Sequence, residues 1–328
     1  MEFERRFIGM DTLITIKVVS DKPPEQIDAI INQSVENFYY VEHVCSRFES
    51  DSELMRLCRH TREPVPVSPL LYHAVSFALE VAKESDGAFD PTIGRAMELR
   101  GFNRNYLHGQ SISSSFADSA DVDYHDIELI GDRYIYLKRA LVIDLNAVVK
   151  GMAVDLTANA MKQAGLANFL INAGGDIYVS GNNDQKEPWR IGIRDPFHRE
   201  QCVGIVCMRQ GAICTSGNYE RRMHPNSEES HLFKPNTHQS PRGLSSCTVV
   251  APFAMLADAF STTAYVLGLE RGMNKMEELG FDCLMITHTA NQFFTQKFKE
   301  NLLWNVLIDR SFEKKVFRQN ALLNIEKC

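Results

Sequence analysis

Hydrophobic residues recur along the chain with two different periods, and these periods predict where strands and helices lie. An alternating stretch at 13–18, within the segment 7–18, is typical of a strand. A first helix is predicted to begin after Pro23-Pro24, and a second to begin at Ser68-Pro69 and end near Asp86-Gly87. The apolar residues at helical spacing are Ile27, Ile30, Ile31, Phe38 and Val41 in the first helix and Leu71, Val75, Ala78 and Val81 in the second.

The second half of the chain mixes both periods. The runs 127–130 and 134–137 flank Gly131-Asp132 and predict a hairpin. Further strands are predicted at 141–144, 169–172, 189–194, 203–208 and 247–250, and further helices at 148–164 and 257–267. The polar segment 222–243 is predicted to be a loop. Because strands and helices alternate irregularly, we predict a mixed α/β (α+β) fold in one compact domain spanning 1–328.

Composition narrows the class of protein. The 328 residues are 44% hydrophobic and 23% charged, which is typical of a globular protein. The net charge is −7 and basic residues are scattered, so we expect no nucleic-acid partner. No apolar stretch approaches the ~20 residues of a membrane span, and residues 1–10 lack an apolar signal segment. We therefore expect a cytoplasmic protein whose eight cysteines, none in a CxxC pair, are reduced thiols.

Asp144 is the first residue that indicates chemistry. It ends the apolar run 141–144 and stands just before the helix predicted at 148–164. A carboxylate at the end of a strand lies where ligands bind in α/β folds, and the amides of the following helix suit phosphate. The alternative is that Asp144 is only a helix cap or a turn residue.

Asp258 and Thr262 form a second candidate pair. They lie four residues apart on the predicted helix and therefore share one face. A carboxylate and a hydroxyl on one face supply oxygen ligands that suit a hard cation such as Mg²⁺. The alternative is that Asp258 only complements the N-terminus of its helix.

Four further segments carry weaker indications, each with a structural alternative. Asp90 in an Asp-Pro pair, the glycines at 174–175 and the hydroxyls that follow the apolar run 212–214 all occur in ordinary turns. His231 is one of three histidines seven residues apart, with His224 and His238. That spacing is not typical of a zinc site, and a histidine in a polar loop is more often exposed than catalytic.

The order of these segments is more specific than any one of them. In sequence order they are GMDT at 9–12, SRF at 46–48, SEL at 52–54, FDPT at 89–92, DLNAVVKG at 144–151, AVD at 153–155, NAGGD at 172–176, TSGNY at 215–219, HLFKP at 231–235 and ADAFST at 257–262. This set resembles the FAD:protein FMN transferase (ApbE) family over roughly residues 7–270. Residues 271–328 are then expected to complete the same domain.

The resemblance implies a function and a set of site residues. Members of the family bind FAD with Mg²⁺ at the diphosphate, attach FMN to a Thr or Ser of a partner flavoprotein and release AMP. The resemblance implies Asp258 and Thr262 as metal ligands, with the backbone carbonyl of Ala147. It implies catalytic roles for His231 and Asp258. The residues implied in FAD binding are Met10, Phe48, Ala88, Phe89, Asp90, Asp144, Lys150 and Thr215.

Two departures from the family pattern keep alternative functions open. Asn146-Ala147 stands where the family has Gly-Gly or Ser, and Lys234 stands where it has Asp. A member that holds FAD without efficient transfer, as a flavin carrier or scaffold, is therefore one alternative. A FAD pyrophosphatase, with water as the acceptor, is another. The lack of a signal segment and lipobox predicts that any acceptor is cytoplasmic or faces the cytoplasm.

Overall fold

The fold is built on one large antiparallel sheet. The computed structural model describes residues 1–104, 109, 111–117, 121–198, 200–219 and 230–301. The strands of the large sheet are β1 (Glu2–Gly9), β2 (Thr12–Val19), β6 (Asn168–Ala173), β7 (Asp176–Ser180), β10 (Gln210–Gly217), β11 (Leu244–Ala251), β12 (Asp282–Thr287) and β13 (Gln292–Phe294). They lie in the order β1-β2-β6-β7-β10-β11-β12-β13, with every neighbouring pair antiparallel.

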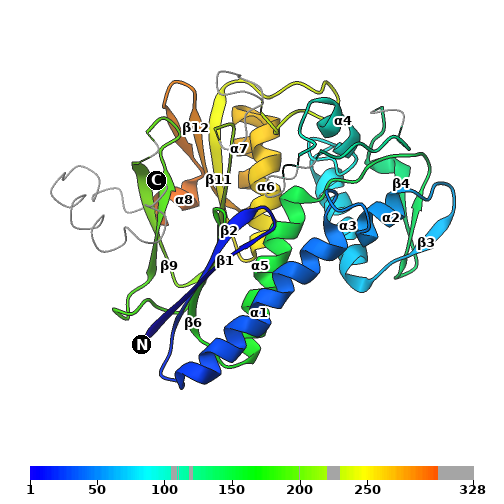
Figure 1. Cartoon of the computed structure of the whole chain (residues 1–328). Helices are drawn as coiled ribbons and strands as arrows, with labels where there is room; N and C mark the ends of the chain where they lie inside the picture. The colour runs from blue at the N-terminus through cyan, green and yellow to red at the C-terminus, as the bar shows by residue number, and fades with distance from the viewer. Residues whose placement is uncertain (105–108, 110, 118–120, 199, 220–229, 302–328) are drawn as a thin grey trace.

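The longer helices of the fold cover one face of this sheet. The helices are α1 (Pro24–Cys45), α2 (Glu53–Cys58), α3 (Pro69–Glu84), α4 (Gly94–Leu99), α5 (Asn146–Gln163), α6 (Ala254–Leu267), α7 (Leu269–Leu279) and α8 (Gln296–Asn301). Helices α1, α5 and α6 pack side by side, and α6 also packs on β10 and β11 (Figure 1). None of the described helices has both the length and the apolar character that a bilayer crossing requires.

The opposite face of the sheet is covered by a hairpin and by α8, whose Phe298 is buried with the hairpin residues. Strands β8 (Trp189–Arg194) and β9 (Cys202–Met208) pair with each other, and their apolar side chains form a cluster with those of β7 and β12. Alternation of side chains along each strand therefore sends one set into the helical layer and the other into this second cluster. The central strands of the sheet are buried on both faces, which explains why β7, β10 and β11 are apolar over most of their length.

A smaller unit packs against the side of the helical layer. Strands β3 (Pro64–Pro66), β5 (Tyr134–Leu137) and β4 (Ile127–Ile130) form a three-stranded sheet, which lies with α2 and α3 on one side of the molecule (Figure 1). A short 3₁₀ helix, Tyr124–Asp126, precedes β4. Ile135 and Leu137 of this sheet are fully buried in the same core as α1 and α5.

The predicted mixed α/β class is confirmed, and most predicted elements occur with small shifts in their ends. The run 141–144 is the exception, because it is not a strand. Leu141, Val142 and Ile143 are fully buried, but the segment makes only one isolated bridge, from Val142 to Ile93. Its apolarity reflects burial between helices and not membership of a sheet.

Helix α6 begins earlier than the sequence predicts. It starts at Ala254, which places Asp258 in its second turn.

The seven cysteines of the described ranges are all free thiols, and five are buried. Cys328, His224 and the expected contribution of 302–328 to the domain lie outside the described residues.

Candidate functional site

A cleft of about 400 Å³ lies between the helical layer and the irregular segments beside the small sheet. Eleven of the twelve site residues expected from the sequence line it, and they are Phe48, Ala88, Phe89, Asp90, Asp144, Ala147, Lys150, Thr215, His231, Asp258 and Thr262. Met10 is not among the lining residues. It occupies the two-residue turn between β1 and β2 with φ of 52°, and the next two residues, Asp11 and Thr12, line the cleft.

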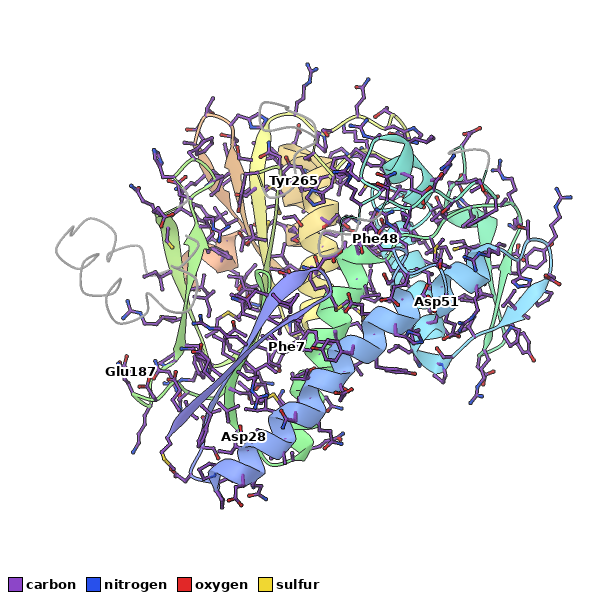
Figure 2. All side chains as sticks on the ribbon, in the orientation of Figure 1. Phe7, Asp28, Phe48, Asp51, Glu187 and Tyr265 are labelled. Carbon is purple, nitrogen blue, oxygen red and sulfur yellow. The ribbon has the colours of Figure 1, made fainter. Side chains whose placement is uncertain are left out.

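The cleft has two walls of different construction. We use the name core wall for the residues on helices α5 and α6 and strands β7 and β10, namely Ala147, Lys150, Asp176, Ser216, Asp258 and Thr262. We use the name loop wall for the residues on segments that follow α1, α3 and α4 and on 231–235, namely Arg47, Phe48, Ala88, Phe89, Asp90, Phe102 and His231. Phe48 lies between the long helices and the small-sheet side of the molecule (Figure 2).

Two residues of α5 fix where α6 begins. Gly151 lies so close to α6 that a Cβ there would stand 2.6 Å from backbone atoms of Ala254 and Met255. Asp155, one turn later, accepts hydrogen bonds from the amides of these same two residues, at 2.8 and 2.9 Å. This carboxylate satisfies donors at the helix N-terminus from outside the helix. The close crossing brings Asp258 of α6 to the same cleft as α5.

Three charged groups of the core wall lie together. Lys150 Nζ donates to Asp176 Oδ2 and lies 3.9 Å from Asp258 Oδ2. Both carboxylates are buried, at 3% and 6% exposure for Asp176 and Asp258. One ammonium beside two buried carboxylates leaves an excess negative charge, which suits a further cation.

A chain of hydroxyls continues the core wall. Ser216 Oγ lies 2.8 Å from Ser261 Oγ and 2.9 Å from Thr262 Oγ1. Thr215, the residue expected from the sequence, is inside β10, and so the ordinary turn proposed as its alternative is wrong. Its hydroxyl lies 2.9 Å from Thr248 Oγ1 on the neighbouring strand. Consecutive strand residues face opposite sides, so Ser216 and not Thr215 faces α6.

The oxygen donors of the core wall fit a hard divalent cation. The carboxylate of Asp258 and the hydroxyl of Thr262 are such donors, and both residues line the cleft together with Ala147, whose backbone carbonyl the resemblance implies as a third. Few protein ligands, all oxygen, are what Mg²⁺ accepts, because it keeps several waters. Within the described ranges, no three His, Cys, Asp or Glu side chains are grouped so as to hold an ion, as a zinc site would require.

The position of Asp258 also decides between its two sequence-based interpretations. It lies in the second turn of α6, and the carboxylate that serves the first turn belongs to Asp155. The alternative that Asp258 complements the helix N-terminus is therefore wrong.

Asp90 combines the turn role with a place in the cleft. Its Oδ1 accepts from the amide and the hydroxyl of Thr92, and its Oδ2 accepts from the amide of Tyr124. Burial raises the pKa of Asp90 to about 6, although these hydrogen bonds oppose the shift. The Asp-Pro turn is thus a buried joint that holds Ala88 and Phe89 against the cleft.

Asp144 lies where the two walls meet. Its Oδ1 accepts from the amide of Asn146, at 2.9 Å, which is the turn role considered as an alternative. Its Oδ2 lies 2.6 Å from Nε of Arg47 in a buried ion pair. Asn146 also lines the cleft, and the Nδ2 of its side chain donates to Asp144 Oδ2 at 3.3 Å.

His231 lines the cleft on a segment that is anchored by its neighbours. Ser230 Oγ accepts from the amide of Leu232, and both Leu232 and Phe233 are buried. The ring of His231 lies edge-on to that of Phe102, with centroids 6.5 Å apart. Lys234, by contrast, is exposed and is not among the lining residues. The cation that departs from the family pattern therefore does not face the cleft.

The sequence interpretation missed several lining residues. Asp176 and Ser216 stood inside quoted motifs but were not selected, and the period of two along 212–216 is the signal that would have selected Ser216. Asp11 and Arg104 also line the cleft. Arg47 also stood inside a quoted motif, SRF at 46–48, and was not selected, because its partners are brought to it only by the tertiary fold.

This mixed α/β fold and its polar cleft define a class of ligand-binding protein whose relatives are known. The family model described as the ApbE family matches residues 10–285. The FAD:protein FMN transferase of Salmonella typhimurium is 34% identical over 262 residues, which cover 76% of this chain and 74% of that protein. The Escherichia coli K12 protein of the same name is 31% identical over 264 residues, 77% of this chain and 75% of that protein.

Solved structures agree with this assignment. The ApbE protein of Thermotoga maritima superimposes with a TM-score of 0.81 at 27% identity, over 92% of this chain and 99% of that chain. The flavin transferase ApbE of Vibrio cholerae gives a TM-score of 0.79 at 26% identity, with the same coverage. The chain belongs to the ApbE family.

Proposed function

We propose that this protein is a FAD:protein FMN transferase that requires Mg²⁺. It moves the FMN half of FAD to the hydroxyl of a Thr or Ser of an acceptor flavoprotein and releases AMP. The acceptor oxygen forms a bond to the phosphorus of the FMN half, the bond from that phosphorus to the bridging oxygen breaks, and AMP leaves with that oxygen. The gathering of Asp258, Thr262, Ala147 and Lys150 in one cleft of an ApbE-family chain is the observation that supports it most.

The core wall is assigned to the diphosphate. Asp258, Thr262 and the carbonyl of Ala147 would hold Mg²⁺, which when bound offsets phosphate charge and makes AMP a better leaving group. Lys150 adds a cation beside the diphosphate, and its bond to Asp176 keeps the ammonium at a fixed place. Placing charge in advance, before the reaction begins, is the main way that such sites lower a barrier.

We assign the loop wall to orienting the dinucleotide and to taking the proton of the acceptor hydroxyl. Phe48, Phe89 and Asp90 supply an aromatic and hydrogen-bonding surface for the dinucleotide. His231 lines the same cleft, and we assign it the role of general base, which accepts the proton of the acceptor hydroxyl. General base catalysis typically raises a rate by about 10²–10⁴.

A transfer assay with matched variants tests the proposal. The protein is incubated with FAD, Mg²⁺ and candidate acceptor flavoproteins, and flavin fluorescence is read in a denaturing gel while AMP is measured by chromatography. Asp258→Asn is expected to lower transfer by roughly a hundredfold or more, because the cation loses its carboxylate. Asp132→Asn, on an exposed turn outside the cleft, is the control and should transfer normally.

The products distinguish the alternatives. Covalent flavin on the acceptor with equimolar AMP supports transfer, and chelation of Mg²⁺ should abolish both. AMP and free FMN without labelled acceptor would indicate a pyrophosphatase. Bound FAD without AMP, for every acceptor offered, would indicate a carrier. Either of the last two results would contradict the proposal.

A further inference from the structure

A buried arginine joins three separate segments around the cleft. Arg47 is only 2% exposed. Its Nη2 donates to the carbonyl oxygen of Phe102 at 2.7 Å, and its Nε lies 2.6 Å from Asp144 Oδ2. Its guanidinium carbon stands 4.3 Å from the centroid of the Phe48 ring. All four residues line the cleft, so one side chain connects the segments that follow α1 and α4 with the start of α5.

The arginine and the aspartate depend on each other. A guanidinium keeps its proton at any working pH, so burial requires a nearby negative charge. Asp144 supplies that charge, and its other oxygen is already bonded to the amide of Asn146. The contact of Nε with Oδ2 is a close ion pair and not an aligned hydrogen bond, and Nη1 makes no hydrogen bond within the described part of the chain. The contacts of Arg47 therefore go to the cleft wall itself.

Arg47 holds the aromatic face of Phe48 beside the carboxylate of Asp144. The guanidinium carbon of Arg47 lies over the ring of Phe48, and its Nε forms the ion pair with Asp144. A lysine in this place would keep the charge but would lose the flat surface and the forked donors. A flat ring beside a fixed carboxylate suits a planar heterocycle or a sugar that carries hydrogen-bond donors. FAD contains both, which connects the arrangement to the substrate and not only to stability.

We propose that Arg47 is a positioning residue for FAD, acting through Asp144 and Phe48, and this inference rests on the proposed function. It holds the two side chains in one fixed relation before the substrate arrives. Its loss lets them move independently, which weakens FAD binding. The acceptor is assigned no contact with Phe48 or Asp144, and Arg47 touches none of the charged groups of the core wall. Arg47 variants therefore raise the KM for FAD much more than the KM for the acceptor.

The test measures FAD affinity and transfer in parallel. FAD binding is followed by quenching of flavin fluorescence on the full chain with Mg²⁺ and without acceptor, and the two KM values come from the transfer assay. Arg47→Met is expected to weaken FAD binding about a hundredfold, the cost of misplaced contact groups. Arg47→Lys should recover part of this loss. Arg139→Met removes an arginine that pairs with the buried Asp126 outside the cleft, and is expected to bind FAD normally.

A double-mutant cycle separates positioning from general stability. If Arg47 acts through Asp144, the variant with both Arg47→Met and Asp144→Asn binds FAD no more weakly than the worse single variant. Additive effects, or FAD affinity within twofold of wild type in Arg47→Met, would overturn the proposal. If Arg47→Met does not fold, as circular dichroism would reveal, Arg47→Lys with Asp144→Asn forms the cycle.

The two proposals fail differently. If wild type transfers flavin and the Arg47 variants match it, the positioning role is wrong and the function stands. If the variants change FAD affinity as expected but wild type labels no acceptor, the function is wrong and the positioning role stands. A wild-type chain that binds no FAD would overturn both.

Discussion

The two walls of the cleft reach a fixed geometry by different means. The core wall takes its side chains from regular elements, and their positions follow from a close helix crossing at Gly151 and from the strand period that turns Ser216 toward α6. The loop wall has no such frame. Its segments are held by buried charged groups whose hydrogen bonds go to backbone, as Asp90 does with Thr92 and Tyr124.

The difference teaches which changes each wall tolerates. Where backbone contacts set the geometry, added volume is the damaging change. Where a buried charge sets it, loss of the partner or a change of protonation is the damaging change. The cleft therefore has one wall sensitive to size and one sensitive to charge. Asp155, which ties α5 to α6, is the place where the core wall also relies on a buried carboxylate.

The largest expected effect comes from adding a methyl group at the helix crossing. Gly151→Ala favours the helix itself by about 1 kcal/mol. Its Cβ, however, would meet backbone atoms of Ala254 and Met255 at 2.6 Å, which no side-chain rotation relieves. We expect a net loss of about 3 kcal/mol in the free energy of unfolding, measured by urea denaturation, because the whole of α6 must shift.

The control for this variant lies on the same helix. Asn159 is exposed on α5, so Asn159→Ala should stabilise the protein by a few tenths of a kcal/mol through helix propensity alone. Opposite signs for the two alanines would establish the crossing as the cause. Equal signs would show that α6 is not held by this contact.

The second prediction concerns pH and compares Asp90 of the loop wall with Asp155, which joins the two helices that carry the core wall. Burial raises the pKa of Asp90 and that of Asp155 to about 6, from 3.8. The protonated forms are therefore favoured in the folded state. The stability that each contributes is fully present below about pH 4 and is lost as the pH rises through 6. We expect about 2 kcal/mol from each group over this window.

Denaturation at pH 4, 5, 6 and 7.5 measures this effect. Asp90→Asn and Asp155→Asn each lower the starting stability, because an amide cannot accept both of the backbone hydrogen bonds that the carboxylate accepts. The informative quantity is the slope: wild type should lose stability relative to each variant as the pH rises. If only Asp155→Asn changes the slope, the loop wall is not held by a titrating group and the contrast between the walls is weaker than described.

The fold was predictable where local periodicity determines it. Pro23-Pro24 and the apolar spacing that follows predicted α1, because its buried face repeats with the helical period. The run 141–144 was misinterpreted as a strand. A fully buried apolar segment has no period that distinguishes a strand from an irregular buried segment. Sheet order was beyond the sequence, since it depends on contacts between distant residues.

The site was predictable to the extent that its residues stand in motifs. Asp258 and Thr262 share a helix face, and this local geometry is visible in the spacing. The ion pair of Arg47 with Asp144 was not visible, because neither residue has a local feature that identifies the other. The charge network that surrounds Lys150 was likewise a product of the fold.

The smallest predicted effect tests whether the charges of the core wall act as one network. Asp176→Asn removes the negative charge that Lys150 Nζ contacts and leaves Asp258, 3.9 Å away, as the nearest carboxylate to the ammonium. The ammonium then competes with the divalent cation for Asp258 Oδ2. On the proposed function, the Mg²⁺ concentration for half-maximal transfer should rise about tenfold, equivalent to ~1.4 kcal/mol.

The variant with both Asp176→Asn and Lys150→Met decides the cause. Without the competing ammonium, the Mg²⁺ requirement should return toward that of Lys150→Met alone. A requirement that stays raised in the double variant would mean that Asp176 serves the cation directly, and that the core wall, like the loop wall, depends on charge more than on backbone geometry.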